Sequence, residues 1–439
     1  MLLAAASLAA PSQPGYDPWA WLLWGREVVE LRLDTVDGPA FKPLPVAVCA
    51  LLAPLGDPAP ALWLLVARAA AALAVLMAGR VAFRLSGGST AAAALAVAGV
   101  ALCEGWWWHA AIGNSEGLLL ALGLLAADAA LDDRHGRALA FAVAAALVRT
   151  EAWPLLGLYG LWLWARRPAL RPWLAAGAVA VPAAWLLPEL WGSGDLLRSS
   201  ERARIPNPGQ PATADRPAWA SLREAAEIPL LPLALAAPAA LAALSRRRGP
   251  ALSLAAAGAG WVALVAAMAE AGYSGEPRYA LPGVALLAVA GAAAVGRLGA
   301  GWTVALALLC APFAVARVDD VRSELRRAAA DAELWGSLPE AVEAADRAGA
   351  RRRCGPPSTG RYRGTGVAWA LNVPKREVDA DSPVGRGLVL RSRIRPGAAV
   401  MPRVPPDAPV IARSKRWEIR CVPASPASRD QSLPHGASH

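Results

Sequence analysis

The sequence predicts an all-α polytopic membrane bundle of about 10 to 11 transmembrane helices, followed by a small C-terminal α+β domain. The 439 residues are 56% hydrophobic and only 18% charged, whereas soluble domains carry about a quarter charged residues. Apolar stretches recur up to residue 317, many near the roughly 20 residues that a helix needs to cross a bilayer. After residue 317 the chain becomes polar, with short apolar runs between Pro and Gly turns. We therefore expect a membrane domain over 1–317.

The membrane domain contains ten recognisable apolar segments, of which the fourth and fifth are short. They lie near 59–79, 89–108, 113–131, 137–150, 152–165, 172–191, 229–245, 250–271, 279–296 and 301–317. The opening MLLAAASLAAP covers about half a span. It lacks the charged start of a signal peptide, so we expect an incomplete first helix.

Basic residues follow every second segment and predict the orientation of the chain. They are Arg80, Arg84, Arg134, Arg137, Arg166, Arg167, Arg171, Arg246, Arg247, Arg248 and Arg297. Basic short loops face the cytoplasm. The alternate connections (13–58, 109–112, 149–153, 192–228 and 273–279) and the polar tail then face outward from a plasma (inner) membrane.

The formal net charge of +10 does not indicate a nucleic-acid partner, because no helix-turn-helix or zinc-finger spacing and no basic surface interleaved with aromatic residues occurs. The sequence also has no phosphate-binding loop for ATP and no dinucleotide fingerprint. The unusual polar motifs gather on the outward side. A reaction there would need a substrate that carries its own energy.

The first outward segment, 13–58, contains a Trp-rich amphipathic helix predicted over 18–33, which we expect to lie in the membrane interface. Asp17 lies just before this helix and Pro18 is its first residue, so the two would also suit a simple helix start without any catalytic role. Asp34, Asp37 and Lys42 follow in a Gly/Pro turn. They are either ligand-binding groups or solvated loop charges.

The other outward segments place polar side chains at the ends of apolar helices. These candidates are His109, Asn114, Glu116, Arg149, Glu151, Glu276, Arg278 and Tyr279. Ionisable residues at membrane depth commonly mark a site. Each also has a simpler explanation: Glu116 could interact with a helix dipole, Arg149 and Glu151 could form an exposed turn, and Arg278 could anchor its span. Arg68, inside a span, is either functional or part of a structural ion pair with Glu104.

The polar tail predicts an α+β domain over 318–425 on the outward side, with residues 426–439 disordered. A helix pair is expected over 319–348 and strands at 365–373, 387–395, 408–412 and 416–422. Cys354 and Cys421 lie where disulfides persist, so we expect them to pair. Cys49, Cys103 and Cys310 lie in apolar segments as packing residues. No spacing of His and Cys residues indicates a metal site.

Three features together resemble the GT-C superfamily of multi-span glycosyltransferases. These are Asp17 with the PWAWLLWGRE helix in the first outer loop, the paired motifs GNSEGLLLAL and LVRTEAWPLL, and the RY-x-LP turn formed by Arg278, Tyr279, Leu281 and Pro282. The resemblance covers 15–317. It departs from the family where Pro18 follows Asp17, since many members have two neighbouring acidic residues there. Asp34 or Asp37 could supply the second carboxylate, which leaves participation of Mg²⁺ or Mn²⁺ open.

The resemblance implies an enzyme that moves a sugar from a polyprenyl-phosphate donor to a glycan, lipid or protein acceptor of the cell envelope. A leaving phosphate needs charge stabilisation, for which we expect Lys42 and Arg278, with Tyr279 beside them. A hydroxyl acceptor needs a base, for which we expect Asp17, in a single inverting displacement. The other candidates would hold the sugar, and loop 192–228 could close over the donor.

Two other functions fit the same predicted spans. A transporter or flippase of lipid-linked sugars would share the phosphate-binding Arg, but it should also show broken helices at the midplane and an internal repeat. Neither is evident in the sequence. A non-catalytic envelope protein on a degenerate GT-C scaffold is the remaining alternative.

Overall fold

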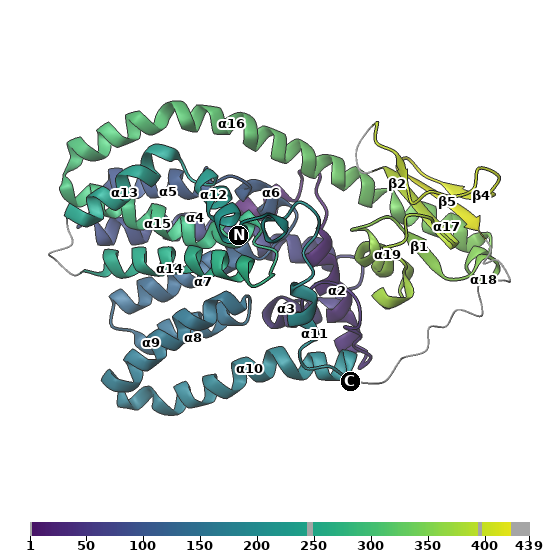
Figure 1. Ribbon diagram of the computed structural model, residues 1–439, viewed down its shortest axis with the longest axis horizontal. Coiled ribbons are helices and arrows are strands. Elements are labelled where there is room, and N and C mark those ends of the chain that lie inside the picture. The colour runs from purple at the N-terminus through teal and green to yellow at the C-terminus, as the bar shows by residue number, and fades with distance from the viewer. Residues whose placement is uncertain (1, 244–248, 394–396, 423–439) are drawn as a thin grey trace. The chain divides into compact units, whose positions relative to one another are not determined.

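The computed structural model describes residues 2–243, 249–393 and 397–422 and divides the chain into two compact units, Met1–Ala329 and Ala330–His439. The expected disordered end at 426–439 lies outside the described residues. Unit 1 is helical (Figure 1). Its elements are α1 Leu2–Ser7, α2 Tyr16–Val29, α3 Pro43–Leu52, η1 Ala53–Leu55, α4 Ala59–Leu85, α5 Thr90–Ala101, α6 Trp106–Ala111, α7 Glu116–Leu131, α8 His135–Ala146, η2 Thr150–Ala152, α9 Trp153–Arg166, η3 Pro168–Leu170, α10 Arg171–Ser193, α11 Arg198–Ala203, η4 Pro211–Thr213, α12 Pro217–Glu227, α13 Leu231–Ala243, α14 Pro250–Glu270, α15 Pro277–Leu298 and most of α16 Ala300–Gly336.

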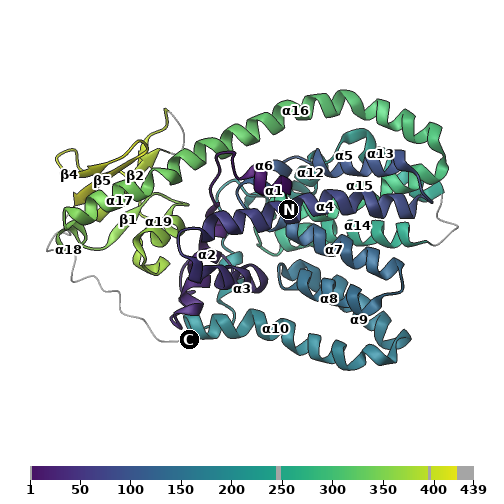
Figure 2. The same ribbon diagram turned by 180° about the vertical axis from the view of Figure 1, so that it is seen from behind.

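Helix α15 forms the centre of unit 1 and packs against α14, α13, α5 and α4. Its small side chains let the neighbours approach closely, as is common between membrane helices. A Cβ at Gly258 would lie 2.6 Å from the carbonyl oxygen of Gly283, and a Cβ at Gly291 would lie only 2.2 Å from the Cβ atom of Ala237. The two opposite views show the long helices of unit 1 running roughly parallel (Figures 1 and 2).

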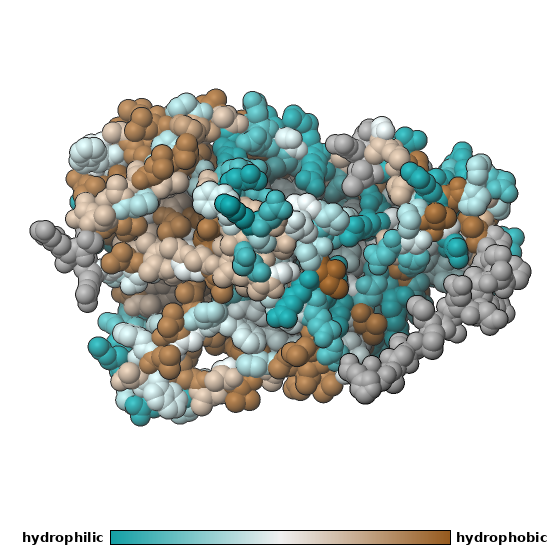
Figure 3. All heavy atoms as spheres, in the orientation of Figure 1, coloured by the Kyte–Doolittle hydropathy of each residue, from teal (hydrophilic) through white to brown (hydrophobic). Residues whose placement is uncertain are grey.

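Five helical segments in the described part of the chain are long and apolar enough to cross a membrane, judged by length and composition. They are Ala59–Leu85, Pro168–Ser193, Pro250–Glu270, Pro277–Leu298 and Ala300–Arg347. The pair α12–α13, bent by 103°, would make a sixth if it counts as one span. Several other expected spans are shorter helices: α5, α7, α8 and α9. Apolar side chains cover much of the surface near α13 and the first half of α16, whereas hydrophilic ones lie around α11 (Figure 3).

The prediction that residues 18–33 form an amphipathic helix with one exposed polar face was wrong. Helix α2 ends at Val29 and is buried on nearly all sides, including Trp21, Trp24 and the carboxylate-bearing Glu27. Arg68 was also assigned the wrong partner. Its guanidinium donates to the carbonyl oxygens of Ser7 and Ala111 at 2.8 and 2.9 Å, whereas Glu104 pairs with Arg317.

Unit 2 combines short helices with a five-stranded sheet of order β1-β2-β5-β4, in which β3 also pairs with β2. Strands β1 and β2 are parallel and the other pairs antiparallel. Its elements are α17 Leu338–Arg347, α18 Ala350–Cys354, β1 Pro357–Thr359, α19 Gly364–Leu371, η5 Lys375–Glu377, β2 Gly387–Arg393, β3 Val400–Met401, β4 Val410–Arg413 and β5 Trp417–Val422. The strand expected at 365–373 is the helix α19, because a short apolar run does not distinguish the two.

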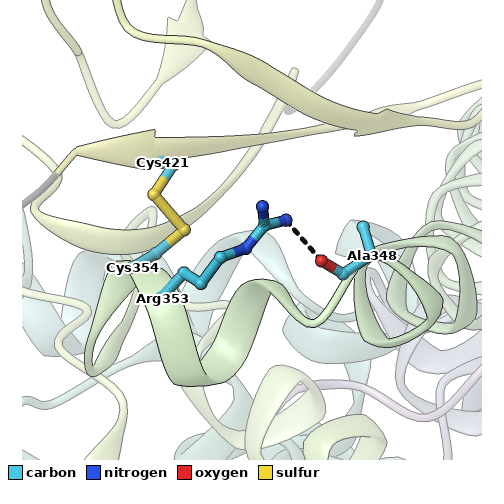
Figure 4. The surroundings of a disulfide bond; sticks show 4 residues. All are labelled: Ala348, Arg353, Cys354 and Cys421. Carbon is cyan, nitrogen blue, oxygen red and sulfur yellow. Dashed lines mark hydrogen bonds between the residues drawn. A yellow bond between two sulfur atoms is a disulfide. The ribbon is translucent and has the colours of Figure 1, made fainter.

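The expected disulfide between Cys354 and Cys421 is present and joins the end of α18 to β5 (Figure 4). The two Cα atoms lie 5.2 Å apart. Cys49, Cys103 and Cys310 are free and buried. The disulfide therefore closes a loop around most of the sheet of unit 2, while the cysteines of unit 1 fill packing positions.

Candidate active site

Ten of the expected site residues lie near one another at one end of the unit 1 helices, and we name this set the polar cluster. They come from the first turn of α2, the start of α3, α6 with the turn after it, the start of α7, the turn into η2, and the start of α15. The members are Asp17, Lys42, His109, Asn114, Glu116, Arg149, Glu151, Glu276, Arg278 and Tyr279.

Asp17 faces Arg278 across the cluster, although 261 positions separate them in the sequence. The Asp17 Oδ2 atom accepts a hydrogen bond of 3.1 Å from Arg278 Nη1, and Arg278 Nε donates to Glu276 at 2.6 Å. Gly15 occupies the N-cap position of α2, and no side chain caps the helix, so Asp17 does not cap it. Burial alone would raise the pKa of Asp17, but Arg278 and then Lys42 outweigh it, and the pKa lies below its ordinary value. Asp17 is therefore a carboxylate that faces cations.

Tyr279 contacts both guanidinium groups of the cluster. The Cζ atom of Arg149 lies 4.1 Å from the ring centroid and that of Arg278 lies 5.0 Å away. Arg149 also donates to Glu116 at 3.0 Å and to Glu151 at 2.9 Å. These three side chains are almost completely buried, so the exposed-turn explanation for Arg149 and Glu151 was wrong.

Lys42 approaches the same cluster from the start of α3. Its Nζ atom donates to Ser115 Oγ at 3.2 Å and lies 4.8 Å from the centroid of the Trp21 ring. Burial, and next the charge of Arg149, lower the pKa of Lys42 to about 8, against the opposing effect of Asp17. Lys42 is thus a buried cation whose charge is sensitive to a change of neighbours.

His109 is an uncharged member of the polar cluster. Asn114 Nδ2 lies 2.9 Å from His109 Nδ1. Because a side-chain amide nitrogen only donates, Nδ1 accepts and the proton is on Nε2. Burial lowers the pKa of His109 to about 4, so the ring remains uncharged at neutral pH and offers one N–H donor.

The turn that carries Asn114 and Glu116 depends on Gly113. Gly113 has φ of 77°, and a Cβ there would lie 2.9 Å from a methyl carbon of Leu64. Its carbonyl oxygen accepts a hydrogen bond of 2.9 Å from Trp63 Nε1. The left-handed turn against α4 thereby places the following polar residues at the start of α7.

Two expected site residues lie outside the polar cluster. The backbone N–H of Asp34 donates to Glu27 at 3.0 Å, and Trp24 Nε1 donates to the carbonyl oxygen of Asp34 at 2.9 Å. The Asp37 carboxylate accepts from the N–H of Gly38 at 2.6 Å. Both aspartates therefore organise the loop between α2 and α3. Asp34 or Asp37 was expected to supply a second carboxylate near Asp17, but the carboxylate whose charge acts on Asp17 is that of Glu116.

Three neighbours of the cluster were missed as site residues. Ser115 and Trp21 contact Lys42, and Gln210 donates to Glu276 from the connection between α11 and α12. Ser115 stands inside a motif that the sequence already singled out, whereas nothing in the sequence marks Gln210. Among the described residues, no group of three or more His, Cys, Asp or Glu side chains is arranged to hold a metal ion.

The polar cluster brings three cationic side chains together with four carboxylates. In the described residues, Glu116 Oε2 and Arg149 Nε are buried without a hydrogen-bond partner, and such atoms are costly unless a ligand or water satisfies them. No protein-family model matches the chain, and neither a curated protein nor a solved structure does. The chemistry of the cluster is therefore the basis for a functional proposal.

Proposed function

We propose that the protein is a membrane glycosyltransferase of the GT-C type that moves a sugar from a polyprenyl-phosphate donor to an envelope acceptor. One observation carries this proposal: a carboxylate, Asp17, lies next to the cations Arg278 and Lys42 in a buried polar cluster at one end of apolar helices. In this proposal the lipid-linked phosphate enters the polar cluster from the bilayer. The cations favour a group that gains negative charge in the transition state.

In the proposed reaction the acceptor hydroxyl loses its proton to Asp17 as its oxygen bonds to the anomeric carbon. The bond from that carbon to the phosphate oxygen breaks, and its electron pair stays on the polyprenyl phosphate. The donor phosphate, a monoanion, gains one negative charge in this step. Lys42 and Arg278 stabilise that charge, and the single displacement inverts the anomeric centre.

The Asp17–Arg278 ion pair suggests how the base becomes active. Arg278 keeps the carboxylate ionised but weakly basic in the free protein. A bound phosphate competes for the same guanidinium. Because loss of a nearby cation raises a carboxylate pKa, donor binding would make Asp17 a stronger base when the sugar arrives.

The other members of the polar cluster would bind the sugar. Glu116 and Glu151 offer carboxylate oxygens to hydroxyl groups, and neutral His109 offers its Nε2–H. The four carboxylates exceed the three cations by one charge, which favours a monoanionic phosphodiester over a more highly charged diphosphate. The balanced step needs no metal ion; dependence of transfer on Mg²⁺ or Mn²⁺ can be measured with a chelator.

We further propose that the shorter apolar helices also lie in the bilayer, giving about 10 to 11 spans, and that the polar cluster and unit 2 face outward from the plasma membrane. Helix α7 begins at the cluster and its last turn carries Asp128, which binds Arg80 and Arg84 at 3.0 and 2.6 Å. Sixteen residues at 1.5 Å rise separate these ends by about 24 Å. Basic loops at the Asp128 end of α7 support a cytoplasmic location for that end. The disulfide in unit 2 supports an oxidising compartment for that unit.

The proposal is tested with purified protein and a panel of short-chain polyprenyl-phosphate sugars in detergent. We expect release of the lipid phosphate with one donor, together with transfer of its sugar to an acceptor. Binding of the donors without any release of lipid phosphate would overturn the enzymatic proposal. Transport of the intact lipid-linked sugar in vesicles would then identify a flippase.

A further inference from the structure

Residues 34–42, which end at Lys42 and which we name the 34–42 segment, have irregular backbone, yet long-range contacts hold them in place. The N–H of Thr35 donates to the carbonyl oxygen of Gly192 at 3.2 Å. Two residues after Lys42, the N–H of Leu44 donates to the carbonyl oxygen of Leu147 at 3.0 Å. The position of Lys42 therefore depends on contacts far away in the sequence.

Arg198 and Ser199 of α11 hold the middle of the segment. Arg198 donates to the carbonyl oxygens of Gly38 and Pro39 at 2.9 and 2.8 Å. Ser199 Oγ accepts a hydrogen bond of 2.7 Å from the N–H of Phe41, the residue next to Lys42. These groups lie about 160 positions from their partners in the sequence, so they fix a loop that has no regular structure of its own.

Glu189 of α10 connects these two side chains. Its carboxylate accepts a hydrogen bond from the Ser199 hydroxyl and lies 3.7 Å from Arg198 Nη1. The side chain of Glu189 is 0% exposed and that of Arg198 only 10%. A buried carboxylate is costly unless it is paired, so Glu189 fixes both the orientation of Ser199 and the charge next to Arg198. The polar chain runs from Glu189 through Ser199 to the backbone beside Lys42.

We propose that Glu189, Arg198 and Ser199 are positioning residues that hold Lys42 inside the polar cluster, where it would bind the donor phosphate. This inference rests on the proposed function only for the role of Lys42. The positioning itself is a property of the free protein. It gives the connection after α10 a specific role, in which α11 acts as a clamp on the 34–42 segment.

The charges and contacts around Lys42 explain why small displacements matter. Arg149, Asp17, Glu116 and Arg278 act on its charge. Ser115 and the Trp21 ring contact the ammonium group directly. Without the clamp, Lys42 would move toward water and away from Arg149, and both changes restore an ordinary lysine pKa.

The test uses the reactivity of Lys42 toward an amine-acetylating reagent, measured by peptide mass spectrometry over a pH series on the full-length protein in detergent. The chain has only three lysines, Lys42, Lys375 and Lys415, so each peptide reports one site. Lys415 has a side chain that is 74% exposed and serves as the internal reference.

In Ser199→Ala we expect the pH midpoint of Lys42 acetylation to rise from about 8 toward the ordinary lysine value. The expected shift is about half a unit to one unit, the size that one or two lost hydrogen bonds supply. The Ser199→Thr variant retains the hydroxyl and should retain the wild-type midpoint. The Ser200→Ala variant is the matched control, because Ser200 on the same helix contacts Tyr273 at 3.1 Å.

An unchanged midpoint in Ser199→Ala, or an equal shift in Ser200→Ala, would overturn the positioning proposal. Glu189→Gln provides a second variant, since it retains an acceptor for Ser199 but removes the charge beside Arg198; it should give a smaller upward shift. Acetylation does not depend on sugar transfer. Failure of the proposed function would therefore appear as absent lipid-phosphate release in the wild type, with these shifts intact.

Discussion

The two ends of helix α7 carry the same chemical groups in opposite surroundings. At its start, Glu116 pairs with Arg149, and their side chains are 1% and 4% exposed. At its last turn, Asp128 pairs with Arg80, and their side chains are 14% and 55% exposed. Solvent screens the second pair, so it contributes little, whereas breaking the first leaves charge in an apolar interior. The contrast shows that burial, and not the presence of an ion pair, distinguishes a candidate site from a surface contact.

The largest expected effect comes from removing the proposed base. In Asp17→Asn we expect sugar transfer to fall by about 10² to 10⁴-fold, the usual contribution of a general base, while donor binding persists. Asp128→Asn makes the same chemical change at the far end of the bundle and should leave transfer unchanged. Single-turnover release of lipid phosphate measures both variants. Wild-type rates in Asp17→Asn would remove Asp17 as the base.

The next effect concerns stability and tests the contrast between the ends directly. Arg149→Met leaves Glu116 and Glu151 as uncompensated buried carboxylates, and we expect it to lower the free energy of unfolding by about 3 to 5 kcal/mol. Arg80→Met should lower it by about 1 kcal/mol or less. Chemical unfolding in mixed micelles gives both values. If both variants lost the same free energy of unfolding, burial would not explain a difference in stability between the two ion pairs.

A smaller effect is expected in the pH dependence of transfer. Because burial, and next Arg149, lower the pKa of Lys42 to about 8, the free protein loses this cation as the pH rises through 8. The ratio kcat/KM for the donor should therefore fall above pH 8. In Lys42→Arg the fall should move to higher pH, since a guanidinium stays charged. Lys415→Arg is the control. If the fall of kcat/KM stayed at the same pH in Lys42→Arg, a group other than Lys42 would be responsible for it.

Much of the polar cluster could be predicted from the sequence, because ionisable residues at the ends of apolar segments stand out against their surroundings. Asp17, Glu116, Arg149 and Arg278 were all recognised in this way. Their pairing could not be predicted: Arg149 and Glu116 are 33 positions apart, and Asp17 and Arg278 are 261 apart. Only the packing of α2, α7, α15 and the turn into η2 brings these groups together.

Other features of the fold had no local signal. The helical spacing of apolar residues in α2, with charged residues opposite, suggested an amphipathic helix, yet Glu27 is buried and its carboxylate accepts a hydrogen bond from the N–H of Asp34. Burial raises the pKa of Glu27 to about 7, a cost that no sequence pattern reveals. The contacts of Arg198 with Gly38 and Pro39 likewise depend on a loop conformation that only the folded chain has.

The central claim is that the polar cluster faces outward and the basic loops face the cytoplasm. Single cysteines at two exposed positions test it most directly: Ala271→Cys in the turn before α15, and Thr90→Cys at the start of α5, just after the basic end of α4. The native free cysteines are buried, so their background labelling should be low. With a membrane-impermeant thiol reagent on intact cells, we expect the cysteine at 271 to react and the cysteine at 90 to react only after permeabilisation. Labelling of both positions from the same side, or the reverse pattern, would contradict the account.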